Sequence, residues 1–253
     1  MYYKFLIDKI SKQTVDLEAL FVDLYRGTTT VTFCNPLTFK ILKGNERFHN
    51  ALENVDYIFS DGILLCKFIK RSTGVDCQRY SFDGNSIAPS VFSMCNKYDL
   101  NVALVGTTDE FIQSAVGKLE KTIKIVYYRN GYLNEDDIRS LPGILAEKKV
   151  NVVIFGMGAP HQEYMLTVLK KNKFKGIAFT CGGYFEQIAK KEIEYYPPFF
   201  NTWNLRWLYR ILMEPRKIMY RYVFDYWPFY RELLKTVKLY KDKDIPQYSN
   251  KPL

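Results

Sequence analysis

VIFGMGAPHQE, residues 153–163, decides the class of fold of this chain. The stretch begins in an apolar run with no polar interruption, which is typical of a strand buried on both faces of a parallel sheet. Two glycines then form a turn, and Pro160 opens a segment with the period of a helix. A strand, a glycine turn and a helix in this order predict one βα unit of an α/β protein.

The same alternation extends on both sides of this stretch, from about residue 29 to residue 181. We expect strands at Thr30–Cys34, Asp56–Phe59, Val102–Val105, Lys124–Tyr127, Val150–Phe155 and Gly176–Thr180. We expect helices at Pro36–Leu52, Ser86–Tyr98, Asp109–Lys121, Glu135–Lys148 and Pro160–Lys171. The pattern predicts a Rossmann-like, mostly parallel sheet with helices on both faces. Functional loops should follow the strands.

Composition excludes several classes of protein. With 253 residues and 47% hydrophobic residues the chain can bury a core, so it is not a disordered protein. Five cysteines without a CxxC pair, and only two histidines, favour neither a disulfide framework nor a zinc site, and we expect no structural metal. The formal charge of +9 suits nucleotide phosphates, nucleic acid or an anionic lipid surface without choosing among them.

The chain has no segment typical of export or of a membrane span. Its first ten residues are interrupted by charges, and nowhere do about 18 apolar residues follow one another. We therefore expect a cytoplasmic protein whose contact with a membrane, if it has one, is peripheral.

The composition changes after Tyr196. Residues 199–243 contain ten Lys and Arg against four Asp and Glu, with thirteen aromatic residues. We expect an α/β catalytic domain at residues 1–196 and a helical, basic and aromatic appendage at residues 197–253. A membrane-associating face and a solvated basic face over a packed aromatic seam both explain this composition.

Two strand ends carry the first site candidates. The turn from Gly156 to Gly158 would present backbone N–H groups and a helix N-terminus to an anion, or it is an ordinary tight turn. Gln162 and Glu163, in the first turn of the helix, could hydrogen-bond a ribose or sugar hydroxyl. The other candidate is Asp61-Gly62, where Asp61 could act as a general base, could bind a metal that carries a diphosphate, or could simply form a turn.

Three further strand ends add candidates. Asn35 either caps the helix that Pro36 opens or faces the same crevice. Gly183 and Glu186 place a glycine and a carboxylate after the last strand. Gly131-Tyr132 either supplies a ring that stacks on a base or forms a turn.

Taken in order, these fragments resemble the glycosyltransferases of the WecG/TagA/CpsF family over residues 31–221. The matching fragments are Asn35-Pro36, Asp61-Gly62, Gly131-Tyr132, Gly156–Glu163, Gly182–Glu186, Trp207-Leu208-Tyr209-Arg210 and Pro215-Arg216. Seven matches in the same order are far more specific than any one of them.

The resemblance implies an inverting, metal-independent transferase without a cofactor. Such an enzyme moves a sugar, of N-acetylmannosamine type or another hexosyl group, from a UDP-sugar to a polyprenyl-diphosphate-linked saccharide in cell-envelope polysaccharide assembly. It implies a protein on the inner face of the cytoplasmic membrane, held there by the appendage. It leaves homo-oligomer formation open and implies no nucleic-acid partner.

The resemblance also assigns roles to residues. Asp61 becomes the general base beside Gly62, and Gln162 and Glu186 become contacts of the donor or the acceptor. Arg210 and Arg216 would meet the diphosphate, since a guanidinium binds phosphate bidentately. The family's threonine two positions before the asparagine is Phe33 here, so Thr32 is the candidate in its place.

Two departures concern the identity of the sugars more than the reaction. Glu186 replaces the family's aspartate after the Gly-Gly turn, and Tyr195-Tyr196-Pro197 replaces Arg-Ala-Pro.

Two other classes of protein remain as alternatives. A nucleotide-dependent oxidoreductase would share the fold, but the first βα unit has no GxGxxG. A basic membrane- or nucleic-acid-binding module without enzymatic activity would explain the charge, but it would leave Asp61 and the turn at Gly156 without a purpose.

Overall fold

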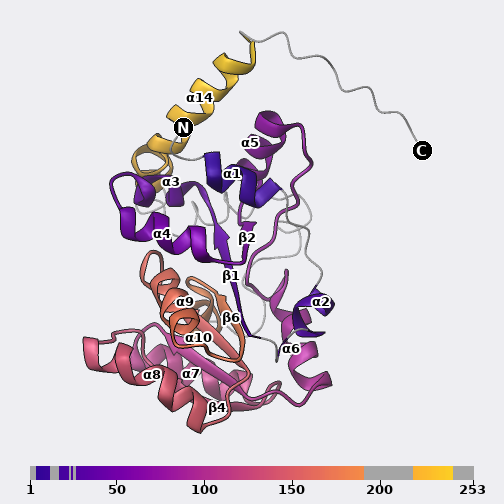
Figure 1. Cartoon of the computed structure of the whole chain (residues 1–253), viewed down its shortest axis with the longest axis vertical. Coiled ribbons are helices and arrows are strands. Elements are labelled where there is room, and N and C mark those ends of the chain that lie inside the picture. Colours follow the sequence, from indigo (N-terminus) through magenta and orange to yellow (C-terminus); the bar gives the residue numbers. More distant parts are fainter. Residues whose placement is uncertain (1–3, 12–16, 23, 25–26, 191–218, 242–253) are drawn as a thin grey trace, which may run out of the picture.

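The computed structural model describes residues 4–11, 17–22, 24, 27–190 and 219–241 (Figure 1). Six strands form one sheet in the order β2-β1-β6-β5-β3-β4, and all neighbouring pairs in it are parallel. The strands are β1 (Thr28–Cys34), β2 (Tyr57–Ser60), β3 (Val102–Gly106), β4 (Ile125–Arg129), β5 (Val152–Gly156) and β6 (Gly176–Thr180). The predicted parallel, Rossmann-like sheet is confirmed, and each strand end lies within two residues of its prediction.

Burial explains why these six runs could be recognised. All residues of β3, β5 and β6 are buried, as expected of inner strands covered on both faces. The edge strand β4 is only partly buried and keeps polar positions.

Helices cover both faces of the sheet. One face carries α1 (Lys4–Ser11), α3 (Pro36–Leu42), α4 (Glu46–Asn54), α5 (Ile63–Thr73), α8 (Glu135–Glu147) and α9 (His161–Lys171). The other carries α2 (Leu17–Val22), α6 (Ala88–Lys97), α7 (Asp109–Leu119) and α10 (Tyr184–Lys190). Each face therefore buries its own apolar core, and the sheet separates the two cores.

The single helix expected at Pro36–Leu52 is wrong, because α3 and α4 are separate helices. Gly44 between them has φ of +77°, a conformation that glycine adopts without a steric cost. Asn45 then caps α4 by accepting a hydrogen bond from the Phe48 N–H at 2.9 Å. Helices α5 and α10 lie in segments for which the sequence predicted no element.

The described end of the chain forms a short π-helical turn, Arg221–Asp225, followed by α14 (Trp227–Lys241). Phe229 of α14 is fully buried, with its ring centroid 5.1 Å from that of Phe39 and 5.2 Å from that of Phe68. Lys40 on α3 pairs with Asp225 at 2.7 Å. This part of the predicted appendage therefore packs on α3 and α5. The expected boundary at residues 196 and 197 lies outside the described residues.

Among the described helices, none combines the length and the apolar character that crossing a bilayer requires.

The order of the strands fixes where a ligand site is expected. From β3 the chain moves outward to β4, whereas from β5 it moves in the opposite direction to β6. Neighbouring strands β3 and β5 therefore form a topological switch point, where the loops at the carboxyl ends separate and leave a crevice.

Candidate active site

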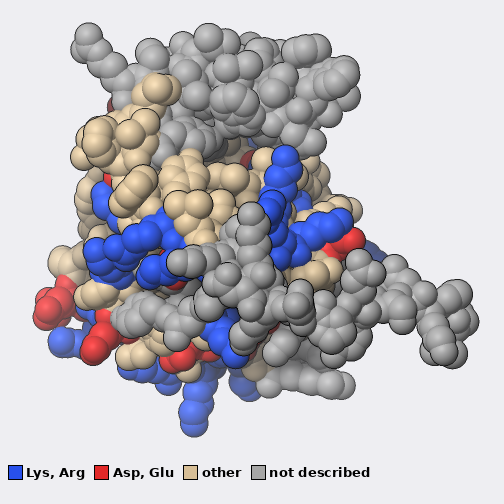
Figure 2. Space-filling view, turned by 90° about the horizontal axis from the view of Figure 1, so that it is seen from above, with Lys and Arg blue, Asp and Glu red and all other residues tan. Residues whose placement is uncertain are grey.

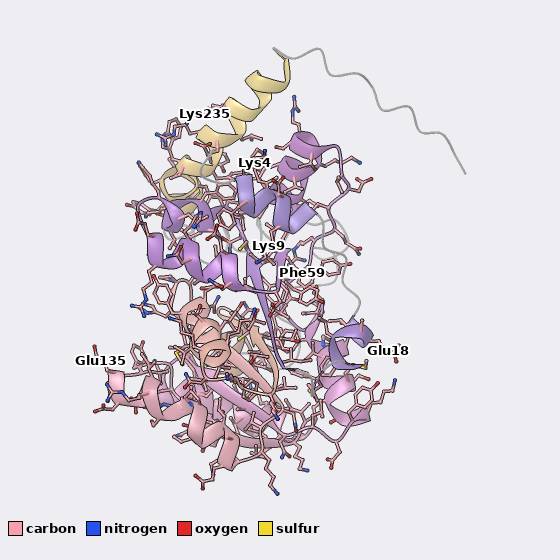
Figure 3. The ribbon with its side chains drawn as sticks, in the orientation of Figure 1. Lys4, Lys9, Glu18, Phe59, Glu135 and Lys235 are labelled. Carbon is pink, nitrogen blue, oxygen red and sulfur yellow. The ribbon has the colours of Figure 1, made fainter. Side chains whose placement is uncertain are left out.

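Asp61 lies at the carboxyl end of β2, in the turn that leads into α5. Its backbone N–H donates to the carbonyl of Cys34 at 2.7 Å, which fixes the turn against the end of β1. Gly62 follows with φ of +140°, a conformation that L side chains rarely adopt, and directly precedes α5. The Asp61 side chain is 37% exposed, so its carboxylate is available to a ligand. Phe59, two residues earlier, lies near the middle of the molecule (Figure 3).

Arg79 is the main functional candidate that the sequence did not indicate. Its Nη2 lies 3.4 Å from Asp61 Oδ1 and 3.4 Å from Asp83 Oδ2, and donates to Ser81 Oγ at 2.7 Å. Residues 79–81 reach the site through their backbone. Arg79 forms an isolated parallel β-bridge with Ser60 at the end of β2, and the Tyr80 N–H donates to the Ser60 carbonyl at 2.9 Å.

The charges of this cluster suit the chemistry of a base. One guanidinium lies between two carboxylate groups, 3.4 Å from an oxygen of each. The Arg79 side chain is 24% exposed, which leaves part of the guanidinium accessible beside Asp61. An accessible carboxylate next to a cation can take a proton from a hydroxyl while the cation holds a phosphate oxygen.

Gln162 and Glu163 face the interior in this structure. Glu163 is 2% exposed, and its Oε1 accepts from Thr32 Oγ1 at 2.9 Å and from Gln162 Nε2 at 2.9 Å. Thr32 also shares a hydrogen bond of 2.8 Å with Thr180, while the Gly182 N–H donates to Gln162 Oε1 at 3.2 Å. The network therefore ties the start of α9 to the ends of β1 and β6.

Burial has an electrostatic consequence for Glu163. Desolvation raises the pKa of its carboxyl above the usual 4.5, although hydrogen bonds from Gln162 and Thr32 act in the opposite direction. Its Oε2 is buried and has no hydrogen-bond partner among the described residues. The sequence predicted that Thr32, Gln162 and Glu163 contact a ligand. To do so, these side chains would have to bind it while they keep their hydrogen bonds to one another.

Asn35 acts as a helix cap. Its side-chain Oδ1 accepts from the Leu37 N–H at 2.9 Å, and Thr38 Oγ1 accepts from the Asn35 N–H at 3.2 Å. This reciprocal pair is a capping box at the start of α3, one of the two roles that the sequence allowed.

Glycines pack closely together at the switch point between β3 and β5, where the order of the strands predicts a crevice, and we call this place the glycine crevice. A Cβ added to Gly106 would lie 2.4 Å from the Gly156 carbonyl oxygen, and one added to Gly156 would lie 2.6 Å from the Phe185 ring. The Gly131 N–H donates to the Thr107 carbonyl at 2.9 Å, which brings the end of β4 to the same place. Only glycine permits backbones to approach this closely.

Polar groups surround this crevice. Thr107 Oγ1 donates to Glu186 Oε1 at 3.2 Å, and Thr107 itself has φ of +49°, unusual for a residue with a side chain. Gly158 has φ of +74° in the turn before α9, and Gly183 stands in the turn before α10. Tyr132 is 74% exposed beside this edge of the sheet. The sequence did not indicate Thr107, whose backbone conformation becomes visible only in the fold.

The predicted residues thus form three groups along one edge of the sheet. Asp61 and Gly62 lie at the end of β2, and the network of Thr32, Gln162 and Glu163 lies beside β1 and β6. The glycine crevice follows at β5, β3 and β4. Arg210 and Arg216 lie outside the described residues.

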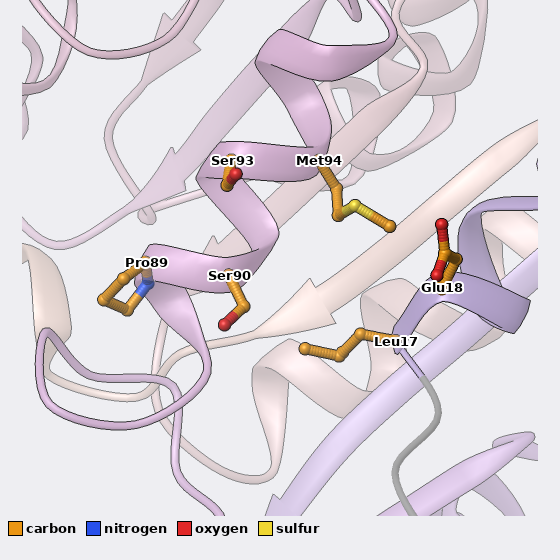
Figure 4. A pocket seen from close by; sticks show the side chains of 6 residues that line it. All are labelled: Leu17, Glu18, Pro89, Ser90, Ser93 and Met94. Carbon is orange, nitrogen blue, oxygen red and sulfur yellow. The ribbon is translucent and has the colours of Figure 1, made fainter.

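A separate hollow lies between α2 and α6, lined by Leu17, Glu18, Pro89, Ser90, Ser93 and Met94 (Figure 4). It contains none of the predicted site residues, and its lining offers Glu18 as the one ionisable group. The chemistry is therefore expected at the carboxyl edge of the sheet and not in this hollow.

A parallel α/β sheet with an accessible carboxylate and a cluster of glycines on one edge fits an enzyme that acts on a substrate carrying phosphate groups. Comparison with known proteins narrows this class. The family model of the glycosyl transferase WecG/TagA/CpsF family matches residues 3–243, so the chain belongs to this family and is a glycosyltransferase. The resemblance inferred from the sequence is confirmed, and neither the oxidoreductase nor the binding module is favoured.

Three relatives show what similar proteins do. The chain is 33% identical to a UDP-Gal:alpha-D-GlcNAc-diphosphoundecaprenol beta-1,4-galactosyltransferase of Shigella boydii, over 87% of this chain and 92% of that protein. It is 23% identical to an N-acetylglucosaminyldiphosphoundecaprenol N-acetyl-beta-D-mannosaminyltransferase of Bacillus spizizenii, over 84% and 82% of the two chains. A protein of the same description from Bacillus subtilis is 23% identical, over 79% and 77%.

Proposed function

We propose that the enzyme transfers a hexosyl group from a UDP-sugar to a hydroxyl of a sugar that is linked through a diphosphate to a polyprenyl lipid. The observation that carries the proposal is the accessible Asp61 carboxylate beside Arg79, on the same sheet edge as the glycine crevice. Relatives named for diphosphoundecaprenol-linked acceptors supply the class of acceptor.

The reaction needs two regions of this edge. Asp61 takes the proton from the acceptor hydroxyl, which then attacks the anomeric carbon of the donor. Backbone N–H groups of the turn at Gly156 and Gly158 hold the UDP that leaves, as donors preorganised for developing negative charge. Tyr132, exposed beside the crevice, offers a ring on which the uracil stacks.

Attack from the face opposite the leaving UDP inverts the anomeric centre. The names of the relatives specify β-linked products, which fits such an attack on an α-linked donor. UDP-galactose is the first donor to test, because the galactosyltransferase is 33% identical and the mannosaminyltransferases are 23% identical.

Replacing Asp61 by Asn tests the base. We expect the turnover number to fall by about two to four orders of magnitude, the usual contribution of a general base. Affinity for UDP should not change, because Asp61 lies three strands away from the crevice in the order of the sheet. Asp136→Asn, at a side chain that is 91% exposed on α8, is the matched control. Turnover close to wild type in Asp61→Asn would remove Asp61 as the base.

Transfer without a metal ion is part of the proposal. The backbone N–H donors of the crevice supply partial positive charge for the diphosphate of the leaving UDP, a task that a divalent cation performs in other transferases. Turnover should therefore be the same with EDTA and with added Mg²⁺ or Mn²⁺. Loss of turnover in EDTA that either cation restores would contradict this part.

Docking on the cytoplasmic face of the membrane is the remaining part of the proposal. The described appendage exposes a group of apolar side chains, each 50% or more exposed: Met219, Tyr220, Val223, Phe224 and Trp227, with Leu234 on α14. Aromatic side chains of this kind partition to the headgroup region. Phe224→Ser with Trp227→Ser should weaken co-sedimentation with vesicles, and unchanged co-sedimentation would refute this role.

A further inference from the structure

Helix α5, in the catalytic domain, presents a basic stripe to the solvent. Ile63, Lys67, Lys70 and Arg71 are exposed, at spacings of four, three and one residues, whereas Leu65 and Phe68 on the opposite side are buried in the core. Spacings of three and four residues place side chains on one face of a helix. We call these four residues the α5 stripe.

Within the part of the chain that the structure describes, the cations of the α5 stripe have few charged partners. Lys70 pairs with Asp76 at 2.6 Å, but the Asp76 side chain is 85% exposed and such a surface pair is weak. Lys67 and Arg71 form no ion pair with another residue of the described chain. Among the described residues, two basic groups of the stripe therefore have no anionic partner.

The α5 stripe lies at the same end of the molecule as α14 (Figure 1). Phe68 of α5 and Phe229 of α14 are in ring contact, which fixes the two helices together. Lys4 and Lys235 also lie in this half of the molecule, while Glu135 lies in the other half (Figure 3). Seen from this end, Lys and Arg side chains gather on either side of an uncharged surface (Figure 2).

Helix α5 also begins at the site. Gly62 directly precedes it, so Asp61 stands two residues before Ile63. At a rise of about 1.5 Å per residue, Lys67 lies about 6 Å and Arg71 about 12 Å beyond Ile63 along the helix axis. A surface that binds the α5 stripe would therefore lie within about one or two helical turns of the carboxylate that we assign as the base.

We propose that the α5 stripe binds the phosphate groups of an anionic lipid bilayer and so holds Asp61 at the level where a lipid-linked diphosphate emerges. The inference rests on the proposed function for the nature of the acceptor. Charge complementarity carries the choice of partner. Lys67 and Arg71, which form no ion pair with the described residues, lie on the helix that packs against α14, and α14 exposes the apolar side chains of Trp227 and Leu234. Basic and apolar side chains together are the combination that an anionic bilayer binds. The membrane contact then includes the catalytic domain, not the appendage alone.

The test compares two double variants of the full chain that lose the same charge. Lys67→Gln with Arg71→Gln removes the two cations of the α5 stripe that form no ion pair with the described residues. Lys121→Gln with Lys148→Gln removes two exposed cations after α7 and α8, at the opposite end of the sheet. Co-sedimentation is measured with vesicles of phosphatidylcholine, with and without phosphatidylglycerol, and turnover is measured with a lipid-linked acceptor in those vesicles and with a short-chain, water-soluble analogue.

Each basic residue near an anionic surface contributes about 1 kcal/mol, a factor of about five, so the α5 variant should bind anionic vesicles about thirtyfold less tightly than wild type. The opposite-end variant should bind like wild type, and neither should differ on vesicles without phosphatidylglycerol. Turnover of the α5 variant should fall with the acceptor in anionic vesicles and stay normal with the soluble analogue.

Equal binding by both double variants would overturn the inference. That result would leave the proposed function intact as long as the wild-type enzyme transfers a sugar to the soluble analogue, because this transfer needs no membrane. If wild type transferred no sugar to either acceptor, the proposed function would fail.

Discussion

Glu163 offers a prediction whose magnitude follows from burial. Its carboxyl is 2% exposed, and desolvation raises its pKa above the usual 4.5. The folded protein therefore keeps a proton that the unfolded chain releases, over the pH range between these two pKa values. Within this range stability falls as the pH rises, by up to about 1.4 kcal/mol per pH unit, and above the folded-state pKa it stays constant.

Glu163→Gln removes this dependence and keeps the shape of the side chain. The amide oxygen can still accept from Thr32 and Gln162, while the amide nitrogen replaces Oε2, an atom that already lacks a partner. The variant should gain stability relative to wild type as the pH rises above 4.5, until the folded-state pKa of Glu163 is passed. Cys34 also lies close to Glu163, and burial raises the pKa of its thiol, so it stays neutral over this range.

The assay is urea unfolding of wild type and variant at a series of pH values. Glu120→Gln, at an exposed position after α7, is the control with the same loss of charge, and its difference from wild type should stay small. Glu163→Ala should cost about 1–3 kcal/mol for each buried donor that loses its partner, at every pH. A difference between Glu163→Gln and wild type that does not change with pH would refute the reasoning.

Three further predictions concern packing and caps. Phe229→Ala should lower the free energy of unfolding by about 3–5 kcal/mol, or lower the free energy of opening of α14, measured by hydrogen exchange, by the same amount. Trp227→Ala, at a side chain that is 61% exposed, should change either free energy little. Gly106→Ala places a Cβ 2.4 Å from a backbone oxygen, so it should lower the free energy of unfolding by at least about 1–3 kcal/mol and weaken UDP binding. Its control, Gly117→Ala, lies in open space on α7 and should raise the free energy of unfolding by about 0.5–1 kcal/mol. Asn35→Ala should cost about 0.5–2 kcal/mol in thermal unfolding, with normal UDP affinity if capping is its role.

Local signals were enough to predict the sheet. The inner strands are continuous apolar runs, and glycine turns or caps mark where most helices begin, so period and length identified six βα or strand units. The same signals failed at Gly44, because residues 36–54 have one helical period on both sides of the break. They also missed α5, because the short apolar run after Asp61-Gly62 fits a buried strand as well as a buried helix.

The site could be predicted only in part, because its contacts are not local. Strand ends gave Asp61 and the glycine turn, since all parallel strands end on one edge. Arg79 stands eighteen residues from Asp61 in the sequence and reaches it through a bridge to Ser60 that no spacing rule predicts. The direction of Gln162 and Glu163 depends on how α9 packs against β1 and β6, which the first turn of a helix does not reveal.

The separation of Asp61 from the glycine crevice bears on how the substrates are arranged. Strand β2 lies three steps from β5 in the sheet, about 14 Å at the usual spacing of strands. A base at Asp61 therefore cannot contact a diphosphate that is bound at the glycine crevice. The distance does accommodate a diphosphate, the transferred sugar ring and the acceptor hydroxyl, one after the other. The network of Thr32, Gln162 and Glu163 joins β1 and β6 to the start of α9, between these two places. In the proposed arrangement of the substrates, this network would lie beneath the transferred sugar. A change in this network should alter the choice of donor sugar before it alters the affinity for UDP.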